Sequence, residues 1–89
     1  MAQAHETITE RIRDLVAEVL RVDPAEVTPD RPFDELAETD SLTLAEIATA
    51  LDVDFSIHIE TPKISGARTV SDLVTLVEQV LDARQDAPG

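Results

Sequence analysis

The chain has 89 residues, a formal charge of −12 and a hydrophobic content of 43%, which comes almost entirely from aliphatic side chains. This length supports one domain, and the aliphatic content suits a small core and is too high for a disordered acidic tail. The charge argues against nucleic acid and anionic membranes as partners, because both require clustered Lys and Arg. The absence of cysteine excludes disulfides, thiol catalysis and Cys-based zinc sites.

The hydropathy pattern predicts where the chain resides. No apolar run approaches the length of about 18 residues that a membrane span needs, and the first residues lack a basic-then-apolar signal pattern. We therefore expect a soluble, cytoplasmic protein.

The first predicted helix lies between residues 7 and 22, where apolar residues recur at helical spacing on one stripe: Ile8, Ile12, Leu15, Val16 and Val19. Thr7 and Glu10 predict a capping box at its start, and Asp23-Pro24 ends the pattern. A long loop over residues 23–39 follows, with one helical turn expected at 24–27. Its apolar anchors are Val27, Phe33 and Leu36. Loops of this length are often functional, so we expect a site at its end.

The second predicted helix starts at residues 40–41, where Asp40 or Thr39 supplies the cap, and ends near residue 54. A capping box of Thr69 and Asp72 starts the last helix, whose apolar stripe is Val70, Leu73, Val74, Val77 and Leu81. The segment between them is anchored by Ile57, Ile59 and Ile64 and is expected to hold a short third helix. The alternation of Phe55, Ile57 and Ile59 would equally suit a strand, although no second strand exists to pair with it.

These elements predict an all-α fold, a small four-helix bundle of three long helices and one short helix, with a long loop between helices one and two. We expect a single, monomeric domain over residues 1–89, with an ordered core at about 7–82 and frayed ends at 1–6 and 85–89.

The second predicted helix has two different faces. The core face is expected to carry Leu44, Ile47, Ala48, Leu51 and Phe55. The opposite face mixes carboxylates with apolar residues that the core does not need: Leu42, Ala45, Glu46, Thr49, Asp52 and Val53. Such a mixture is typical of singly exposed apolar residues, which are common, or of a transient interface with electrostatic specificity.

The distribution of charge favours the interface. Residues 32–62 contain no Lys or Arg, and their acidic residues are Asp34, Glu35, Glu38, Asp40, Glu46, Asp52, Asp54 and Glu60. An acidic stretch centred on one helix indicates docking onto basic patches of other proteins, whereas an acidic face kept only for solubility is the alternative.

Ser41 follows Asp40 at the end of the long loop, and by itself this pair is typical of helix capping. A nucleophilic serine would need a base and an orienting acid, and no such partner is evident, because His5 and His58 are both expected to be surface residues. The pattern Asp52-Val53-Asp54 lacks the glycine and the ligand spacing of a calcium loop, so we expect no metal site. A serine without catalytic machinery suits modification by a partner enzyme better than attack on a substrate.

Several segments resemble the acyl carrier protein family over roughly residues 8–81. Asp40-Ser41-Leu42 resembles its D-S-L signature, and residues 41–47 resemble the S-L-x-x-x-E-[LI] opening of its second helix. Leu20-Arg21-Val22 with Glu26-Val27, Phe33-Asp34-Glu35-Leu36, Ala50-Leu51 with Phe55, and Arg68 to Leu73 match other parts of the family pattern in order. The resemblance implies a carrier and not an enzyme. Ser41 would receive 4′-phosphopantetheine from coenzyme A, with Asp40 and Leu42 beside it, and would hold acyl intermediates as thioesters.

One departure from the family pattern matters. The usual L-G-x-D-S-L becomes Leu36-Ala37-Glu38-Thr39-Asp40-Ser41-Leu42, which lacks the glycine and is one residue longer. The glycine of the pattern would let the loop turn tightly beside the phosphopantetheine arm, so its absence leaves the geometry of this loop open. By analogy the departure favours polyketide or another specialised fatty-acyl pathway over housekeeping fatty-acid synthesis.

The resemblance also implies the partners, namely a phosphopantetheinyl transferase and acyl-handling enzymes such as an acyltransferase or a ketosynthase, each with a basic patch. The residues expected to meet them are Asp40, Leu42, Ala45, Glu46, Thr49, Asp52 and Val53. A small aliphatic core is expected, and opening between helices to shelter an acyl chain is the alternative. Two other functions are open: a free-standing peptidyl or aminoacyl carrier protein, and an acidic interaction module that never carries cargo.

Overall fold

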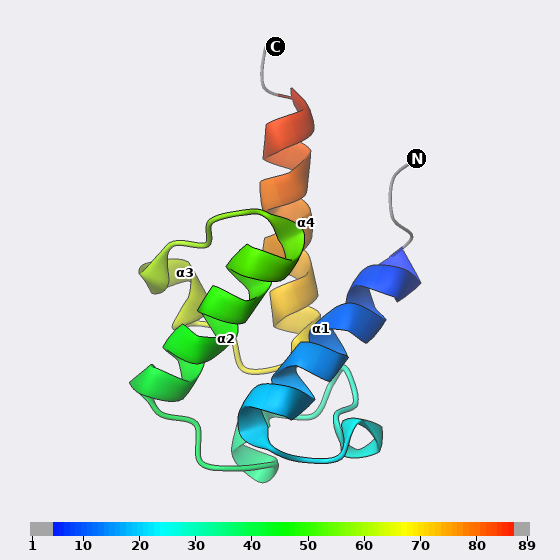
Figure 1. Ribbon diagram of the computed structural model, residues 1–89, viewed down its shortest axis with the longest axis vertical. Helices are drawn as coiled ribbons and strands as arrows, with labels where there is room; N and C mark the ends of the chain where they lie inside the picture. The colour runs from blue at the N-terminus through cyan, green and yellow to red at the C-terminus, as the bar shows by residue number, and fades with distance from the viewer. Residues whose placement is uncertain (1–4, 87–89) are drawn as a thin grey trace.

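The structure, a computed structural model, describes residues 5–86 (Figure 1). The long helices are α1 (His5–Leu20), α2 (Ser41–Phe55) and α4 (Val70–Asp86), and the short helix is α3 (Thr61–Ile64). Two 3-10 turns, η1 (Pro24–Glu26) and η2 (Phe33–Glu35), lie in the loop between α1 and α2. This confirms the predicted all-α bundle with three long helices, one short helix and a long first loop.

Residues 5–86 form no strand, so the alternation at residues 55–59 does not produce one. No helix in this part of the chain has the length and hydropathy needed to cross a membrane. Residues 1–4 and 87–89, which fall within the predicted frayed ends, lie outside the described residues, whereas residues 5–6 and 85–86 are helical.

The two ends of α1 differ from the prediction. The helix is already formed at His5, so Thr7 lies inside it and the predicted capping box at Thr7 and Glu10 is wrong. At the other end Arg21 adopts a left-handed conformation with φ 61°, and the Val22 N–H donates to the carbonyl of Ala17 at 3.0 Å. The helix therefore ends through this backbone turn, before the chain reaches Pro24.

The start of α4 confirms the predicted capping box. The Asp72 N–H donates to Oγ1 of Thr69 at 3.2 Å, and Oδ2 of Asp72 accepts from the N–H groups of Arg68 and Thr69 at 2.9 and 3.3 Å. These bonds occupy backbone donors that the first turn of a helix leaves unpaired.

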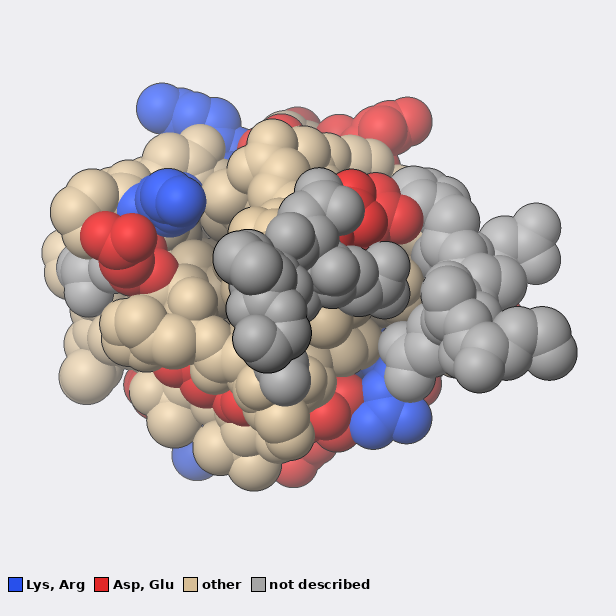
Figure 2. Space-filling view, turned by 90° about the horizontal axis from the view of Figure 1, so that it is seen from above, with Lys and Arg blue, Asp and Glu red and all other residues tan. Residues whose placement is uncertain are grey.

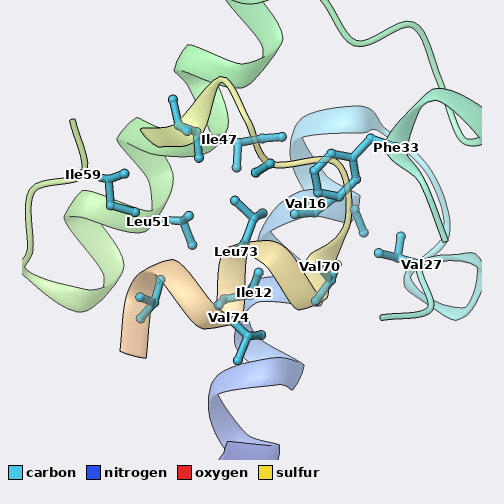
Figure 3. Close-up of a cluster of buried hydrophobic side chains, with 14 of the residues drawn as sticks. Ile12, Val16, Val27, Phe33, Ile47, Leu51, Ile59, Val70, Leu73 and Val74 are labelled. Carbon is cyan, nitrogen blue, oxygen red and sulfur yellow. The ribbon is translucent and has the colours of Figure 1, made fainter. Parts of the chain in front are cut away.

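The core lies where α1, α2 and α4 meet, and Figure 3 shows side chains from all three pointing inward. Fully buried residues include Ile12, Val16, Ile47, Leu51, Leu73 and Val77, and Ile59 and Ile64 are buried from the region of α3. The stripes predicted for the three long helices face this core, but not all of their members are fully buried. Leu15 and Val19 of α1, Leu44, Ala48 and Phe55 of α2, and Leu81 of α4 are only partly buried at its edge.

The long loop is fixed to the rest of the bundle. Val27 and Phe33 are buried, as predicted, and Leu36 packs on the core edge. The Phe33 N–H donates to the carbonyl of Arg68 at 2.8 Å, and the Ser71 N–H donates to the carbonyl of Pro29 at 3.0 Å. The predicted turn at residues 24–27 is present as η1, whereas η2 was not predicted. The loop therefore delivers the chain to α2 along a defined path beside the start of α4.

Figure 1 shows α1 descending and α2 ascending side by side, so the two helices are antiparallel. α1 also packs against α4, and α3 contacts both α2 and α4. In this arrangement one face of α2 is not covered by another helix, and this face lies next to α1.

Candidate functional site

Asp40 is the N-cap of α2, which decides between the two predicted caps. Its Oδ1 accepts from the backbone N–H of Thr43 at 2.8 Å and from the Thr43 hydroxyl at 2.9 Å. Thr39 instead turns back, and its hydroxyl donates to the carbonyl of Ala37 at 3.2 Å. Asp40 thus holds the first turn of α2 in place immediately before Ser41.

The same contacts set the charge of Asp40. The two hydrogen bonds from Thr43, backbone first and hydroxyl second, hold the pKa of the Asp40 carboxyl below its usual value. The carboxylate therefore stays ionised at neutral pH next to Ser41. Its negative charge also interacts favourably with the positive end of the α2 dipole.

Ser41 is the first residue of α2, and its side chain is exposed. His58 follows the opposite end of α2, which is about 20 Å away for a helix of this length. It therefore lies too far from the serine to act as its base. The loop before Ser41 lacks the glycine of the family pattern, and its backbone conformation does not require one. Among the described residues only Arg21 and Ser56 have positive φ, and neither lies in this loop.

The outer face of α2 carries the mixture predicted for it. Leu42 and Val53 are 68% and 77% exposed, and they are the only large hydrophobic residues among the described ones with that degree of exposure. Ala45, Glu46 and Thr49 are exposed between them. The structure thus brings Leu42, Ala45, Glu46, Thr49 and Val53 onto one surface that begins beside Ser41.

Asp52 is placed differently from the rest of this set. Its Oδ1 accepts from the N–H of Ile59 at 2.9 Å, and its Oδ2 lies 3.5 Å from Nδ1 of His58. Its side chain is 27% exposed. Asp52 therefore holds the segment after α2 against the end of the helix, so its charge is partly committed within the molecule.

Asp54 is also committed, to a partner on α1. Nε and Nη2 of Arg11 donate to its two carboxylate oxygens at 2.8 and 2.6 Å, and the guanidinium lies 5.9 Å from the centre of the Phe55 ring. This bidentate pair joins α1 to the end of α2. Asp52 and Asp54 thus bind different neighbours. Residues 32–62 contain no Lys or Arg, but Arg11 of α1 neutralises the carboxylate of Asp54.

A hollow of about 660 Å³ lies between α1 and α2. From α2 it is lined by Leu42, Ala45, Glu46, Thr49, Ala50, Val53 and Asp54, and from α1 by Leu15, Glu18 and Val19. We call it the α1–α2 groove. The α1 wall of the groove was not predicted, because Leu15 and Val19 have the same helical spacing as the buried residues of their stripe.

The charge on the surface is uneven. In Figure 2, which looks onto the end of the molecule opposite the loops, a run of acidic side chains follows one edge, and the few basic side chains stand apart from one another. Much of the remaining surface in this view is uncharged.

Comparison with known proteins indicates the family to which the chain belongs. A family model described as the phosphopantetheine attachment site matches residues 10–77, which include the long loop, Ser41 and all of α2. The meromycolate extension acyl carrier protein of Mycobacterium leprae is 31% identical over 98% of this chain and 76% of its own length. The protein of the same name from Mycolicibacterium smegmatis is 30% identical over 98% and 88%.

A protein from Rhodococcus erythropolis that is named simply acyl carrier protein is 31% identical over 90% of this chain and 88% of its own length. Proteins of this family are carriers and not catalysts. A phosphopantetheinyl transferase modifies them, and acyl-handling enzymes act on the acyl groups that they carry. From the four-helix fold, the matched attachment region and these relatives together, the chain belongs to the acyl carrier protein family and carries covalently bound phosphopantetheine.

Proposed function

We propose that Ser41 is the residue that bears the phosphopantetheine arm. The observation that carries this proposal is the position of Ser41. It is exposed, it is the first residue of α2 directly after the Asp40 cap, and it lies inside the matched region. The other serines fit less well. Ser56 follows the far end of α2, Ser65 follows α3, and Ser71 is half-buried in the first turn of α4 with its N–H bound to Pro29.

The surroundings of Ser41 fit the group. An exposed hydroxyl can be reached by a transferase, and a phosphodiester formed on it would lie next to the N-terminal turn of α2, which favours negative charge. The arm supplies a terminal thiol that holds an acyl group as a thioester. The chain contributes position: α2 and its cap hold the attachment point on a rigid element. A tethered group then has a raised effective concentration at each partner's active site.

The cargo that we propose is an acyl intermediate of a polyketide or another specialised fatty-acyl pathway. Two of the similar proteins are named for meromycolate extension, which supports an acyl cargo over an amino acid. A peptidyl or aminoacyl carrier would have the same fold and the same serine. Loading assays that offer acyl donors with an acyltransferase, and amino acids with an adenylating enzyme, separate the two. Loading by the adenylating enzyme alone would contradict the proposed cargo.

The partner surface that we propose is the outer face of α2, with Leu42, Ala45, Thr49 and Val53 as contacts and Glu46 as the principal charge. Asp40 and Asp52 add charge at its edges, although Asp52 also binds Ile59. Carriers must release their partners readily, and exposed charges with a few apolar contacts suit fast and weak association.

Intact mass spectrometry tests the attachment site. The protein is incubated with coenzyme A, magnesium and a broad-specificity phosphopantetheinyl transferase, and we expect the mass of one phosphopantetheinyl group to be added. Ser41→Ala is expected to abolish the addition. Ser65→Ala, which removes another exposed serine, is the matched control and is expected to leave it unchanged. Labelling of the Ser41→Ala variant, or no labelling of the unaltered chain, would refute the assignment.

A further inference from the structure

The α1–α2 groove has a largely apolar lining. Most of its residues are apolar or small, and no basic side chain is among them. Leu42 and Val53 mark its two ends along α2, and Leu15 and Val19 form the wall on α1. Leu15 and Val19 therefore continue an apolar surface that starts with Leu42 and Val53, the two exposed large hydrophobic residues of α2.

The acidic residues of the groove are distributed in a definite way. Asp54, on the α2 wall of the groove, is neutralised by Arg11 of α1. Glu18 and Glu46 remain, one on each wall, and both are exposed. An occupant of the groove thus meets an apolar floor with one negative charge on either side.

The dimensions of the groove favour a helix as occupant. Leu42 and Val53 are eleven positions apart on α2, which corresponds to about 16 Å, or three helical turns. Ala45, Thr49 and Ala50 line the middle, and such small side chains allow another backbone to approach. A helix of three turns presents large apolar side chains at i, i+4 and i+7 on one stripe, which matches a floor of this length.

We propose that the α1–α2 groove is a docking site for an amphipathic helix of a partner protein, with aliphatic side chains on the stripe that faces the groove and Lys or Arg on both sides of it. The charge complementarity with Glu18 and Glu46 supports this occupant. The proposal deepens the partner surface proposed above, because it extends that surface from α2 onto α1. It does not require Ser41 to be modified.

The test uses a synthetic peptide of about 14 residues, blocked at both ends, with leucines at i, i+4 and i+7 and lysines on both flanks. A second peptide of the same composition has its leucines spread around the helix. Each is titrated into the full-length protein at about 0.1 M salt, and binding is followed by NMR chemical shifts and calorimetry. We expect the striped peptide to bind at least fivefold more tightly than the scrambled one and to shift resonances of both Val19 and Val53.

Variants separate the groove from general attraction to an acidic protein. Glu18→Lys, on the α1 wall, and Val53→Ser, on the exposed α2 wall, are each expected to weaken binding of the striped peptide about fivefold or more. Asp82→Lys makes the same change of charge at an exposed position of α4 outside the groove, and is expected to change binding less than twofold. Ser41→Ala is expected to bind normally, which distinguishes failure of this proposal from failure of the attachment site.

Several results would overturn the proposal. Equal affinity for the two peptides, or equal losses in the Asp82→Lys and Glu18→Lys variants, would show attraction by charge alone. Self-association without peptide that Val53→Ser abolishes would assign the groove to a second copy of the chain. Loss of peptide binding on acylation of the arm, with groove resonances shifting in the acylated protein alone, would assign it to the protein's own cargo.

Discussion

Asp52 allows the structural and electrostatic roles of one carboxylate to be separated. Asp52→Ala removes the acceptor of the Ile59 N–H, and Ile59 is only 3% exposed. A buried N–H left unpaired costs about 1–3 kcal/mol. The cost here belongs to the lower part of that range, because the Asp52 side chain is 27% exposed, so water can reach the region, and alanine favours the helix by a few tenths of a kcal/mol.

We therefore expect Asp52→Ala to lower the free energy of unfolding by about 1 kcal/mol, which corresponds to a fall in Tm of about 4–8 °C for a domain of this size. Asp52→Asn keeps an acceptor oxygen at the same place and is expected to lose no more than about half as much. Thermal unfolding followed by circular dichroism measures both. Glu46→Ala is the matched control on the exposed face of the same helix, with an expected change within about 0.5 kcal/mol.

A Tm of Asp52→Ala equal to that of the control would refute the reasoning. So would equal losses in Asp52→Ala and Asp52→Asn, since the acceptor would then not be the stabilising element. The result also decides how docking is tested: Asp52→Asn removes the charge while keeping the loop attached, whereas reversal to Lys would disturb both.

Three further predictions concern the docking charge, the core and the cap of α2. Glu46→Lys is expected to lower kcat/KM for modification by a phosphopantetheinyl transferase, more at low salt than at high salt, and equal rates at both would place recognition elsewhere. Leu51→Ala, in the core, is expected to cost about 2–5 kcal/mol in denaturant unfolding, against less than about 0.5 kcal/mol for exposed Val53→Ala. Thr43→Val removes the hydroxyl donor to Asp40 and keeps the N–H, so an NMR titration is expected to show the pKa of Asp40 raised toward its usual value. Because that pKa is depressed in the folded state, the stabilisation from Asp40 is fully present above the unfolded-state pKa of about 3.9 and is lost as pH falls through the folded-state pKa. An unchanged pKa of Asp40 in Thr43→Val would contradict the account of the cap.

The periodicity of apolar residues was enough to predict the three long helices, because burying one stripe of each of them is what forms this core. The same signal did not distinguish Ile12 and Val16 from Leu15 and Val19, since periodicity does not say whether a neighbouring element covers each residue. The capping box at Thr69 was predicted because its partners are close in sequence. The one at Thr7 was wrong because helix formation begins earlier in the chain.

The candidate site was predictable where it depended on local sequence, as with Asp40, Ser41 and the exposed face of α2. Its other features depend on residues that are distant along the chain. The pairing of Arg11 with Asp54 requires the antiparallel approach of α1 and α2. The contact of Asp52 with Ile59 requires the chain to turn back after α2, where Ser56 adopts a left-handed conformation. Neither follows from composition or spacing.

The two backbone hydrogen bonds that join the long loop to the start of α4 also bear on the order of folding. They connect Phe33 with Arg68 and Ser71 with Pro29, so each links residues from opposite halves of the chain. Such distant pairs form late, because closing the intervening segment costs entropy before any contact repays it. During synthesis, the loop that leads to Ser41 can form these two bonds only once the chain has been made as far as Ser71, in the first turn of α4. A transferase that reads this loop together with α2 would thus pass over shorter nascent chains.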